Sequence, residues 1–564
     1  MNWNSPETRS ADVPHTTVDK KFQAYVDELL ALDPSPSTDQ LIKSAAWLFG
    51  EHAFDQAARV RDRVDLLVEK KEASYLKLSR SIDSKRGNIS GSLAASYQLM
   101  QQRQASNLSV RLLEGRMREI SGWIPTIAGE YTPLTPSSTT TVVHLVKESA
   151  PYLSNGFCSR SHYNFKAELA AGLKPIVLTE PGYPWNVAGA QDARTEMRLD
   201  GIGHYHFDLG SASVKDLPVD QMLEMWADLA YQKIKIIRPA LIHASSGRRG
   251  YETALVGLAL KRKTGLPFVY EVRSFFEANW TAENERESTG EIFERRMATE
   301  LLCMQEADRV LTIGEAMRED LINRGISAEK IDIIPNGVDT EIFTKQDRDE
   351  NLAGSLGLEG LPTFGYVSNM DHYRESQETL VHAAAVLQDR GSNLHCVIVG
   401  DGPRRTVVES LAAELGVADR IHFLGRVQHE DIPAYYSLID IFVVPRISER
   451  AATYVTPLKP FEAMATGRPV VTSDLPALRE IVSAPQRGLT FPAGDHHALA
   501  TLLQELENNS ERRKQLAEAG YEWASTQRSW TSNGPRYVDA FAKVTSNWPG
   551  TQRPSQTETT GATE

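Results

Sequence analysis

The sequence predicts an α/β protein with two doubly wound parallel-sheet domains in tandem, preceded by an α-helical N-terminal region. From residue 141 onward, short apolar runs rich in β-branched residues alternate with helical stretches, and a second such series begins after 335–337. Residues 17–123 show helical periodicity and almost no signal for strands. The 564 residues are enough for roughly three to four domains of about 150 residues each.

Composition and charge exclude several classes of protein. Hydrophobic residues make up 41% of the chain and charged residues 24%, as expected of a globular protein with a sizeable core. The net charge of −13 argues against a nucleic-acid binder held by a global positive field. The longest apolar runs, such as 439–445, are shorter than the roughly 18–20 residues that span a membrane.

The N-terminus and the cysteines predict where the protein resides. The first residues are polar and lack an apolar export region. Cys158, Cys303 and Cys396 are too far apart for a CxxC metal or redox site, so we expect reduced thiols. These features predict a cytoplasmic protein, either free or peripheral at the inner face of the membrane.

The first 130 residues are predicted to form a helical N-terminal extension. A break at 83–91 separates an amphipathic helical stretch from a second helix over 93–120. A lone helical hairpin must bury its apolar stripe against something. We therefore expect an interaction or oligomerisation module, for a second copy or a protein partner, that lies outside the catalytic cleft. A polar linker follows at 124–141.

The two sheet domains are predicted at 139–335 and 336–528. Their strand sequences are TVVHLV, KPIVLT, ALIHAS, PFVYEV, RVLTIG and KIDIIP in the first, and TFGYVS, HCVIVG, IHFLG, IDIFVVP and RPVVTS in the second. Nearly unbroken apolar runs are typical of parallel strands covered on both faces. The cleft between two such domains is the default ligand site. Residues 548–564 lack apolar anchors, which predicts a disordered tail.

Ligands of open α/β sheets bind beyond the carboxyl ends of the strands, which singles out the loop after IDIFVVP. Thr456 suits a helix cap, Pro457 the first helical position, and Lys459 the first turn. A helix N-terminus and an ammonium group together suit a diphosphate. Glu462, one turn further, is placed to accept both hydroxyls of a ribose. An ordinary capped helix with a solvated Lys and Glu is the alternative.

The loop after HCVIVG is a second candidate. Gly400 and Gly402 follow the strand directly, and paired glycines let the backbone approach a ligand closely. They resemble the start of a GxGxxG fingerprint, but Arg405 occupies the third glycine position. A plain tight turn between strand and helix is the alternative.

Basic residues follow three strands of the first domain. They are Arg160, after Asn155-Gly156; His243, Arg248 and Arg249; and Arg273, between Glu271 and Glu277. Lone His and Arg residues usually cap helices or pair with an acid, but three such clusters facing one cleft favour an anion-binding surface. Motifs for other chemistries, HExxH, GxSxG and GxxxxGK[ST], do not occur in the sequence. The DxD-like 347–349 lies in a charged loop, so we expect neither a metal nor a bound cofactor.

Six motifs of the second domain occur in a fixed order: IIPNGVDTEIF, VIVGDGPRR, IHFLGRV, YYSLIDIFVVP, PFEAMATGRPVV and GLTFPAGD. With them, residues 141–545 resemble the GT-B glycosyltransferases, which have two Rossmann-like domains, and specifically the family-four (group 1) retaining enzymes. The resemblance implies a nucleotide-diphosphate sugar as donor and a glycan, lipid-linked or small-molecule acceptor, without metal or nucleic acid. Residues 335–339 would cross from acceptor to donor domain, and 529–547, with Trp530, would be the return helix.

The resemblance also implies roles for individual residues. Glu462 matches the second glutamate of the family's Glu-x7-Glu motif, which holds the ribose. Asn155 and Gly156 would lie in the loop that closes over the phosphates and the sugar. The nucleotide pocket and the backbone frame of the base would be formed by Gly400, Gly402, Arg426 and Val427.

The chain departs from the family pattern at the first glutamate of that motif, which would fall at Tyr454. A subset of the family is similar here, with a proline–arginine after the preceding strand and a TPLKP-like run. This chain has Pro445-Arg446 and Thr456-Pro457-Leu458-Lys459-Pro460. The histidine that many members carry after the fifth strand appears as Arg273, and the usual Arg/Lys pair of the donor domain is reduced to Arg374.

Breaking the bond between sugar and diphosphate develops negative charge that a metal-free enzyme must stabilise with cations and helix ends. We expect Arg446 and Lys459, together with Arg374, to do so, while His243 and Arg273 line the sugar and acceptor side. Retention would proceed by front-face attack, with the leaving phosphate taking the acceptor's proton. Two alternatives stay open: a non-catalytic subunit that recruits a partner, which Tyr454 supports, and a sugar epimerase or phosphorylase.

Overall fold

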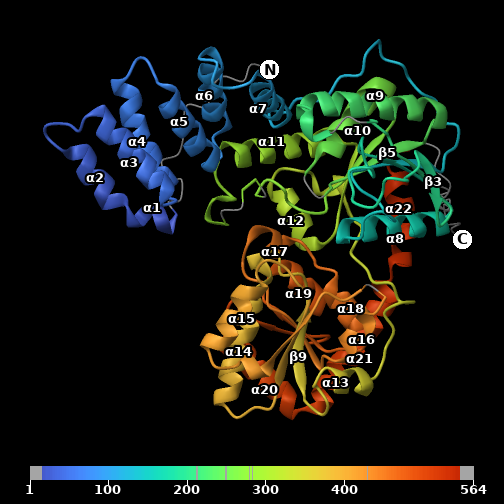
Figure 1. Ribbon diagram of the computed structural model, residues 1–564. Coiled ribbons are helices and arrows are strands. Elements are labelled where there is room, and N and C mark those ends of the chain that lie inside the picture. Colours follow the sequence, from blue (N-terminus) through green and yellow to red (C-terminus); the bar gives the residue numbers. More distant parts are fainter. Residues whose placement is uncertain are drawn as a thin grey trace, which may run out of the picture.

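The computed structural model describes residues 16–210, 214–247, 250–278, 280–281, 284–428 and 430–545. A helical N-terminal region lies beside the first of two α/β domains, and the second domain lies below the first in Figure 1. The predicted fold class is therefore confirmed. The predicted disordered tail, and Arg248 and Arg249, lie outside the described residues.

The N-terminal region is helical, as predicted, and has its own small core around Leu41, Leu48 and Val60. Its described helices are α1 Thr17–Lys21, α2 Gln23–Ala31, α3 Thr38–Gly50, α4 Phe54–Leu67, α5 Ala73–Lys85, α6 Ile89–Gln101 and α7 Asn107–Glu119. The single helix predicted over 93–120 is wrong. Arg103 adopts a positive φ of 58° after α6, and the Ser106 side chain accepts a bond from the Ser109 N–H (3.1 Å), which starts α7 as a separate helix.

The first domain is built on an eight-stranded sheet of order β3-β4-β2-β1-β5-β6-β7-β8, parallel except for β3. Its strands are β1 Thr141–Val146, β2 Lys174–Thr179, β3 Glu196–Leu199, β4 Ile202–Tyr205, β5 Leu241–Ser245, β6 Phe268–Glu271, β7 Arg309–Thr312 and β8 Ile331–Ile333. The six predicted strands all occur. The β3–β4 hairpin was not predicted, although Asp200 and Gly201 between its strands both have positive φ, as in a two-residue hairpin turn.

The helices of the first domain cover both faces of this sheet. They are α8 Gly156–Ala170, α9 Val219–Ile237, α10 Glu252–Thr264, α11 Gly290–Glu306 and α12 Glu315–Asn323, with 3-10 turns η1 Val214–Asp216, η2 Asn284–Arg286 and η3 Ala328–Lys330. The last helix of the chain, α22 Asn533–Ala542, also belongs here. Its Tyr537 and Phe541 are buried against strand residues of the first sheet, such as Val142 and Leu241, so the chain returns to the first domain at its end.

The second domain has a six-stranded parallel sheet of order β11-β10-β9-β12-β13-β14. Its strands are β9 Thr363–Val367, β10 His395–Val399, β11 Ile421–Gly425, β12 Ile441–Val444, β13 Val470–Ser473 and β14 Leu489–Phe491. Its helices are α13 Glu350–Ser355, α14 Gln377–Asp389, α15 Arg405–Glu414, α16 Ile432–Ser437, α17 Arg450–Tyr454, α18 Lys459–Ala465, α19 Pro476–Val482, α20 His496–Asn508 and α21 Ser510–Gln527, with turns η4 Tyr373–Glu375, η5 Ala418–Arg420 and η6 Trp530–Ser532.

Both sheets reverse their strand order beside their first strand. The reversal lies between β1 and β5 in the first sheet and between β9 and β12 in the second. Loops at such a point diverge and leave a crevice at the carboxyl edge, which is where open α/β sheets bind ligands. Of the helices within the described residues, none has the length and apolarity needed to cross a membrane.

Polar contacts join the two domains. Arg450 on α17 forms ion pairs with Glu277 (2.8 Å) and Asp320 (3.0 Å) of the first domain. Glu480 on α19 accepts a hydrogen bond from the backbone N–H of Glu315 on α12 (2.8 Å). Burial raises the pKa of Glu480 to about 7, and its Oε1 is buried with no hydrogen-bond partner among the described atoms.

We expect Glu480→Gln to stabilise the protein at pH 8.5 but hardly at pH 5. The folded pKa of Glu480 lies above its ordinary value, so the folded state holds the proton more tightly, and stability is lost as the pH rises from about 4.5 to about 7. Glutamine keeps the acceptor for the Glu315 amide without the buried charge. The gain at pH 8.5 should be about 1 kcal/mol after allowance for solvent screening.

Thermal unfolding of both proteins at pH 5 and pH 8.5 measures this effect. Glu505→Gln, at an exposed position of α20, serves as the control and should change neither melting temperature. Equal effects of Glu480→Gln at the two pH values would contradict the prediction.

Candidate functional site

Arg446, at the carboxyl end of β12, is held by a buried carboxylate. Its Nη2 and Nε donate to the two oxygens of Glu375 (2.8 and 3.1 Å), and its Nη1 donates to the carbonyl of Val455 (3.1 Å). Burial would lower the pKa of Arg446, but attraction to Glu375 raises it, so this side chain stays charged. Only 12% of the side chain is exposed. Arg446 therefore holds the loop that carries Val455, and its charge is already balanced.

Lys459 and Glu462 face the cleft from the start of α18. The Lys459 ammonium lies 3.1 Å from Glu462 Oε2, which also accepts a hydrogen bond from the Tyr436 hydroxyl (2.6 Å). The hydrogen bond from Tyr436 thus fixes the Glu462 carboxylate. The Lys459 side chain is 36% exposed. Of the two cations predicted for the leaving group, Lys459 is the more accessible.

The predicted cap of this helix is wrong. α18 begins at Lys459, two residues later than expected, and Leu458 occupies the N-cap position without a side-chain bond. Thr456 instead accepts from Asn336 Nδ2 at both its carbonyl (2.7 Å) and its hydroxyl (3.2 Å), so it fixes the loop to the interdomain crossing. Pro457 lies between this anchor and the helix. The short helix α17 precedes the loop and was not predicted.

The two glycines after β10 permit a close approach to a neighbouring loop. A Cβ at Gly400 would lie 1.8 Å from the carbonyl oxygen of Ser368, and one at Gly402 2.5 Å from the carbonyl carbon of Met370. Both neighbours belong to the loop after β9. The tight-turn alternative thus explains both glycines, and it leaves their contact with a ligand a prediction.

Two further predicted residues lie along the same edge of the sheet. Arg426 is exposed just after β11, and Val427 packs partly against the domain core. Arg374, after β9, is held only loosely, with its guanidinium 3.9 Å from Glu375 and 4.0 Å from Glu449. The predicted donor residues therefore follow the carboxyl edge from β11 to β12.

Asn155 and Gly156 approach this edge from the first domain. Asn155 caps α8 by accepting from the N–H groups of Phe157 (2.9 Å) and Cys158 (3.0 Å), and it donates to Glu148 (3.1 Å). A Cβ at Gly156 would lie 3.8 Å from Leu458 Cδ1. The start of α8 and the start of α18 thus meet across the cleft.

The predicted anion-binding surface of the first domain is not formed by Arg160. This side chain is buried, and it donates to Glu271 Oε1 (2.5 Å), to Asn336 Oδ1 (2.7 Å) and to the carbonyl of Ile334 (2.6 Å). Arg273 is also paired with Glu271, at 3.1 Å from Oε2. Attraction to both arginines keeps the pKa of Glu271 well below its ordinary value despite complete burial, which alone would raise it.

His243 does not line the cleft as expected. It is only 1% exposed and contacts His144, Nδ1 to Nδ1 at 2.8 Å, and Glu271 at 3.3 Å. Burial lowers its pKa to about 4, so its ring is neutral at physiological pH. The side chain of His243 points from β5 into the core, where it contacts Glu271.

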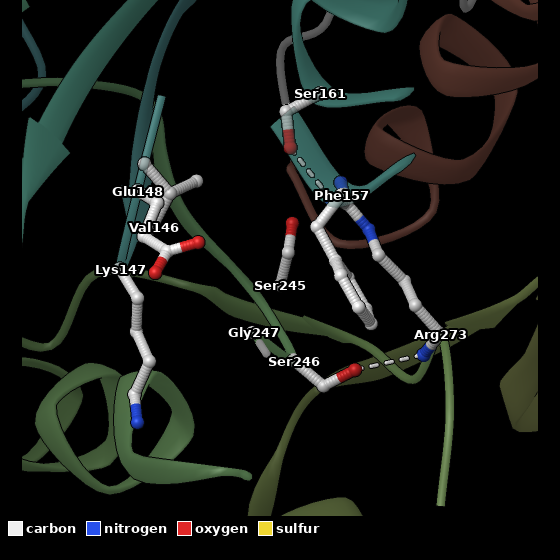
Figure 2. Close-up of a pocket in the computed structure, with 9 residues that line it drawn as sticks. All are labelled: Val146, Lys147, Glu148, Phe157, Ser161, Ser245, Ser246, Gly247 and Arg273. Carbon is white, nitrogen blue, oxygen red and sulfur yellow. Dashed lines mark hydrogen bonds between the residues drawn. The ribbon is translucent and has the colours of Figure 1, made fainter. Parts of the chain in front are cut away.

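Arg273 lies at a crevice of the first domain, although its side chain is only 3% exposed. With Ser161, Ser246 and Gly247 it lines a narrow crevice between the carboxyl ends of β1 and β5, where the strand order reverses (Figure 2). Its Nη1 donates to Ser161 Oγ (2.6 Å) and its backbone N–H to Ser246 Oγ (2.8 Å). Lys147 and Glu148 follow β1 on the opposite wall in Figure 2.

Several residues of this site were not singled out from the sequence. They are Lys147, Glu148, Glu375 and Tyr436. Lys147 and Glu148 directly follow a predicted strand, so the rule of strand ends could have found them. Glu375 and Tyr436 pair with residues 71 and 26 positions away, which no local pattern reveals. Among the described side chains, no group of three or more His, Cys, Asp or Glu is arranged to hold a metal ion.

Comparison with known proteins agrees with this architecture. Residues 347–523 match the family described as Glycosyl transferases group 1, and residues 200–342 match Glycosyltransferase Family 4. A GDP-mannose-dependent α-(1-6)-phosphatidylinositol monomannoside mannosyltransferase of Mycobacterium tuberculosis is 30% identical over 38% of this chain and 56% of its own length. A 2-deoxystreptamine glucosyltransferase of Streptomyces kanamyceticus is 28% identical over 40% of this chain and 58% of its length. The chain thus spans little more than half of these relatives.

Solved structures share the fold over a longer stretch. Sucrose-phosphate synthase from Thermosynechococcus elongatus superposes with a TM-score of 0.59 at 20% identity, over 72% of this chain and 98% of that one. Anabaena Alr3699/HepE in complex with UDP-glucose gives 0.54 at 17% identity, over 71% and 99%. At these identities the structural similarity shows the fold alone. The evidence from sequence comes from the two family matches. The chain belongs to the group 1 glycosyltransferases of the GT-B fold.

Proposed function

We propose that this protein transfers a sugar from a nucleotide-diphosphate sugar to a hydroxyl group of an acceptor, with retention and without a metal. One observation carries the proposal: the start of α8, with Asn155 and Gly156, meets Leu458 at the start of α18. The two carboxyl edges therefore converge where a donor bound to the second domain would present its sugar to the first.

The nucleotide is proposed to bind along the second domain. Glu462 would accept the ribose hydroxyls, since Tyr436 fixes its carboxylate at the cleft. Arg426 and Val427 would frame the base through their backbone, with the loop of Gly400 and Gly402 beside them. Ionised carboxylates form the stronger class of hydrogen bonds, which suits a ribose anchor.

The departing diphosphate is proposed to be stabilised by side-chain cations. Lys459 is 36% exposed and is held at 3.1 Å by Glu462, and Arg374 is held at 3.9–4.0 Å by its acids, so both cations are kept in place beside the proposed diphosphate. Arg446 would act with Lys459 by fixing the loop between them through Val455. Charge that develops in the transition state is best met by such preorganised groups.

The sugar and the acceptor are proposed to meet at the crevice of Arg273. Retention would proceed by front-face attack, in which the acceptor oxygen bonds to the anomeric carbon while the bond to the diphosphate breaks. The acceptor's proton passes to the leaving phosphate oxygen. His243 would support Glu271, which in turn holds Arg273 in place.

The names of the relatives leave the donor open. One mycobacterial relative is described as GDP-mannose-dependent, a Streptomyces relative as a glucosyltransferase, and the Anabaena structure contains UDP-glucose. A panel of UDP-, GDP-, ADP- and dTDP-sugars, followed by thermal shift and by product analysis, tests the proposal. A donor at 100 times its Kd should stabilise the fold by about 2.7 kcal/mol.

The same panel separates the alternatives. Tyr454 favours a non-catalytic subunit, and it packs edge-on against Phe275 of the first domain, with ring centroids 6.0 Å apart. Hydrolysis or transfer supports the proposed transferase. Binding without turnover supports the non-catalytic subunit, and isomerisation of the donor supports an epimerase.

Glu462→Gln should weaken donor binding by about 1–3 kcal/mol, the cost of a lost charged hydrogen bond. Glutamine keeps the volume and an acceptor for Tyr436, so the fold should be unaffected. Calorimetric titration with the donor found in the panel measures the change. Glu518→Gln is a matched control, because Glu518 also pairs with a lysine of this domain, Lys345, at the opposite end of α18. Unchanged donor affinity in Glu462→Gln would refute the assignment.

Lys459→Met should lower kcat by about 100-fold while donor Kd changes less, because its contact is made mainly in the transition state. Lys345→Met, the control, should leave both constants unchanged. EDTA should leave the wild-type rate intact, since side chains carry the positive charge. Normal turnover of Lys459→Met, or complete loss of wild-type activity on chelation, would contradict this prediction.

Arg446→Ala should lower both kcat and stability, because it leaves Glu375 buried without its counter-ion, at a cost of about 3–5 kcal/mol. The double change Arg446→Met and Glu375→Gln should restore the melting temperature but not kcat. Thermal unfolding and steady-state kinetics measure the two effects. Full turnover of the double variant would show that Arg446 has no part in catalysis.

A further inference from the structure

A cavity of about 520 Å³ opens beside the crevice of Arg273, at the carboxyl ends of β1 and β2. Its walls come from the first domain and also from α7 of the N-terminal region, which contributes Leu112 and Arg116. The sequence predicts that the N-terminal helices lie outside the catalytic cleft, and in the structure α7 lines this cavity of the first domain. Figure 1 shows α7 between α6 of the N-terminal region and α9 of the first domain, and it packs against both.

The position of α7 is fixed by close packing and by charge. Gly115 permits the approach, since a Cβ there would lie 2.6 Å from Asp220 Oδ1 and 3.0 Å from the backbone nitrogen of Val219. Asp220, buried at the start of α9, forms ion pairs with Arg111 (2.7 Å) and Arg118 (3.3 Å) of α7. Asp220 is buried whereas both arginines are partly exposed, so the two ion pairs, together with the close approach at Gly115, hold α7 against the start of α9.

Part of the cavity lining is apolar. It includes Leu112 of α7, Val187 after β2, Leu217 before α9 and Met222 of α9. Leu112 is 36% exposed although it faces this hollow, so a ligand there would cover apolar surface that is now in contact with water. A site that served a sugar alone would not need such a wall.

Polar side chains also line the cavity. Lys147 and Glu252 form an ion pair there (2.9 Å), and Arg116, one turn from Leu112 on α7, contributes to the same lining. Burial would lower the pKa of Arg116, but Glu119 and Glu252 raise it. Charged groups in partly buried ion pairs hold defined positions and offer both donors and acceptors to hydroxyl groups.

Two of the polar residues also line the crevice of Arg273. Lys147 and Glu148 line both hollows, and Glu148 accepts a bond from Asn155 (3.1 Å). A hydroxyl group held at Lys147 and Glu148 would thus reach the place where the donor sugar is proposed to lie.

We propose that α7 completes the acceptor site, and that the acceptor is a hydroxylated molecule, such as a sugar, that carries an apolar group. The hydroxylated part lies at Lys147 and Glu148, and the apolar group lies against Leu112, Val187 and Met222. The inference rests on the proposed transferase function. It assigns the choice of acceptor in part to the N-terminal region.

Binding of n-octyl β-D-glucopyranoside to the full chain, kept below its critical micelle concentration, tests the proposal, with methyl β-D-glucopyranoside as the probe without a tail. Calorimetry or saturation-transfer NMR gives the Kd. The octyl glycoside should bind at least about tenfold more tightly than the methyl glycoside, since its tail buries apolar area. Leu112→Asp should remove most of this difference and leave donor binding unchanged.

Leu108→Asp is the matched control, because Leu108 lies one turn earlier on α7, is 52% exposed and does not line the cavity. Val187→Asp, at another residue of the apolar lining, repeats the test without altering α7. Equal binding of the two glycosides, or wild-type octyl glycoside binding in both wall variants, overturns the proposal. If the donor panel shows no binding or turnover while these results hold, the transferase function fails and the cavity remains a binding site for alkyl glycosides.

Discussion

The buried carboxylate of Glu271 holds the two halves of the site together. It lies at the end of β6 and is bonded by Arg160 (2.5 Å), Arg273 (3.1 Å) and the hydroxyl of Tyr537 (3.0 Å). These partners come from α8, the loop after β6 and the return helix α22. A buried charge must be paired, so each of these elements is tied to one position.

The same network reaches the second domain. Arg160 donates to Asn336 at the crossing between domains, and Asn336 donates to Thr456 before α18. The start of α18, with Lys459, is thus located by a chain of hydrogen bonds that begins in the first domain. The cost is that Arg160 is not available to bind an anion. Arg273 still lines the crevice, because its Nη1 donates to Ser161 and its backbone N–H donates to Ser246, just after β5.

The parts that the sequence predicted correctly follow from local pattern. Unbroken apolar runs identified the parallel strands. The rule of strand ends singled out Lys459, Glu462 and Arg273, whose roles stay predictions. The errors arose where a distant partner decides the outcome. His243 is buried and its imidazole contacts that of His144, 99 positions away. Arg160 pairs with Glu271, 111 positions away. The β3–β4 hairpin was missed because each strand has only four residues and β3 has none that is buried, although Asp200-Gly201 was a usable signal.

The place of α7 explains why family comparison says little about the acceptor. The family matches cover 200–342 and 347–523, which include the donor-side loops but begin after α7, β1 and β2. The residues of the large cavity at Leu112, Lys147 and Val187 all lie outside those segments. A wall supplied by a helix that Gly115 and Asp220 lock to α9 can be changed without disturbing the nucleotide site, since the two share no residue. On the proposed function, a donor site within the family matches is therefore combined with an acceptor wall that lies outside them.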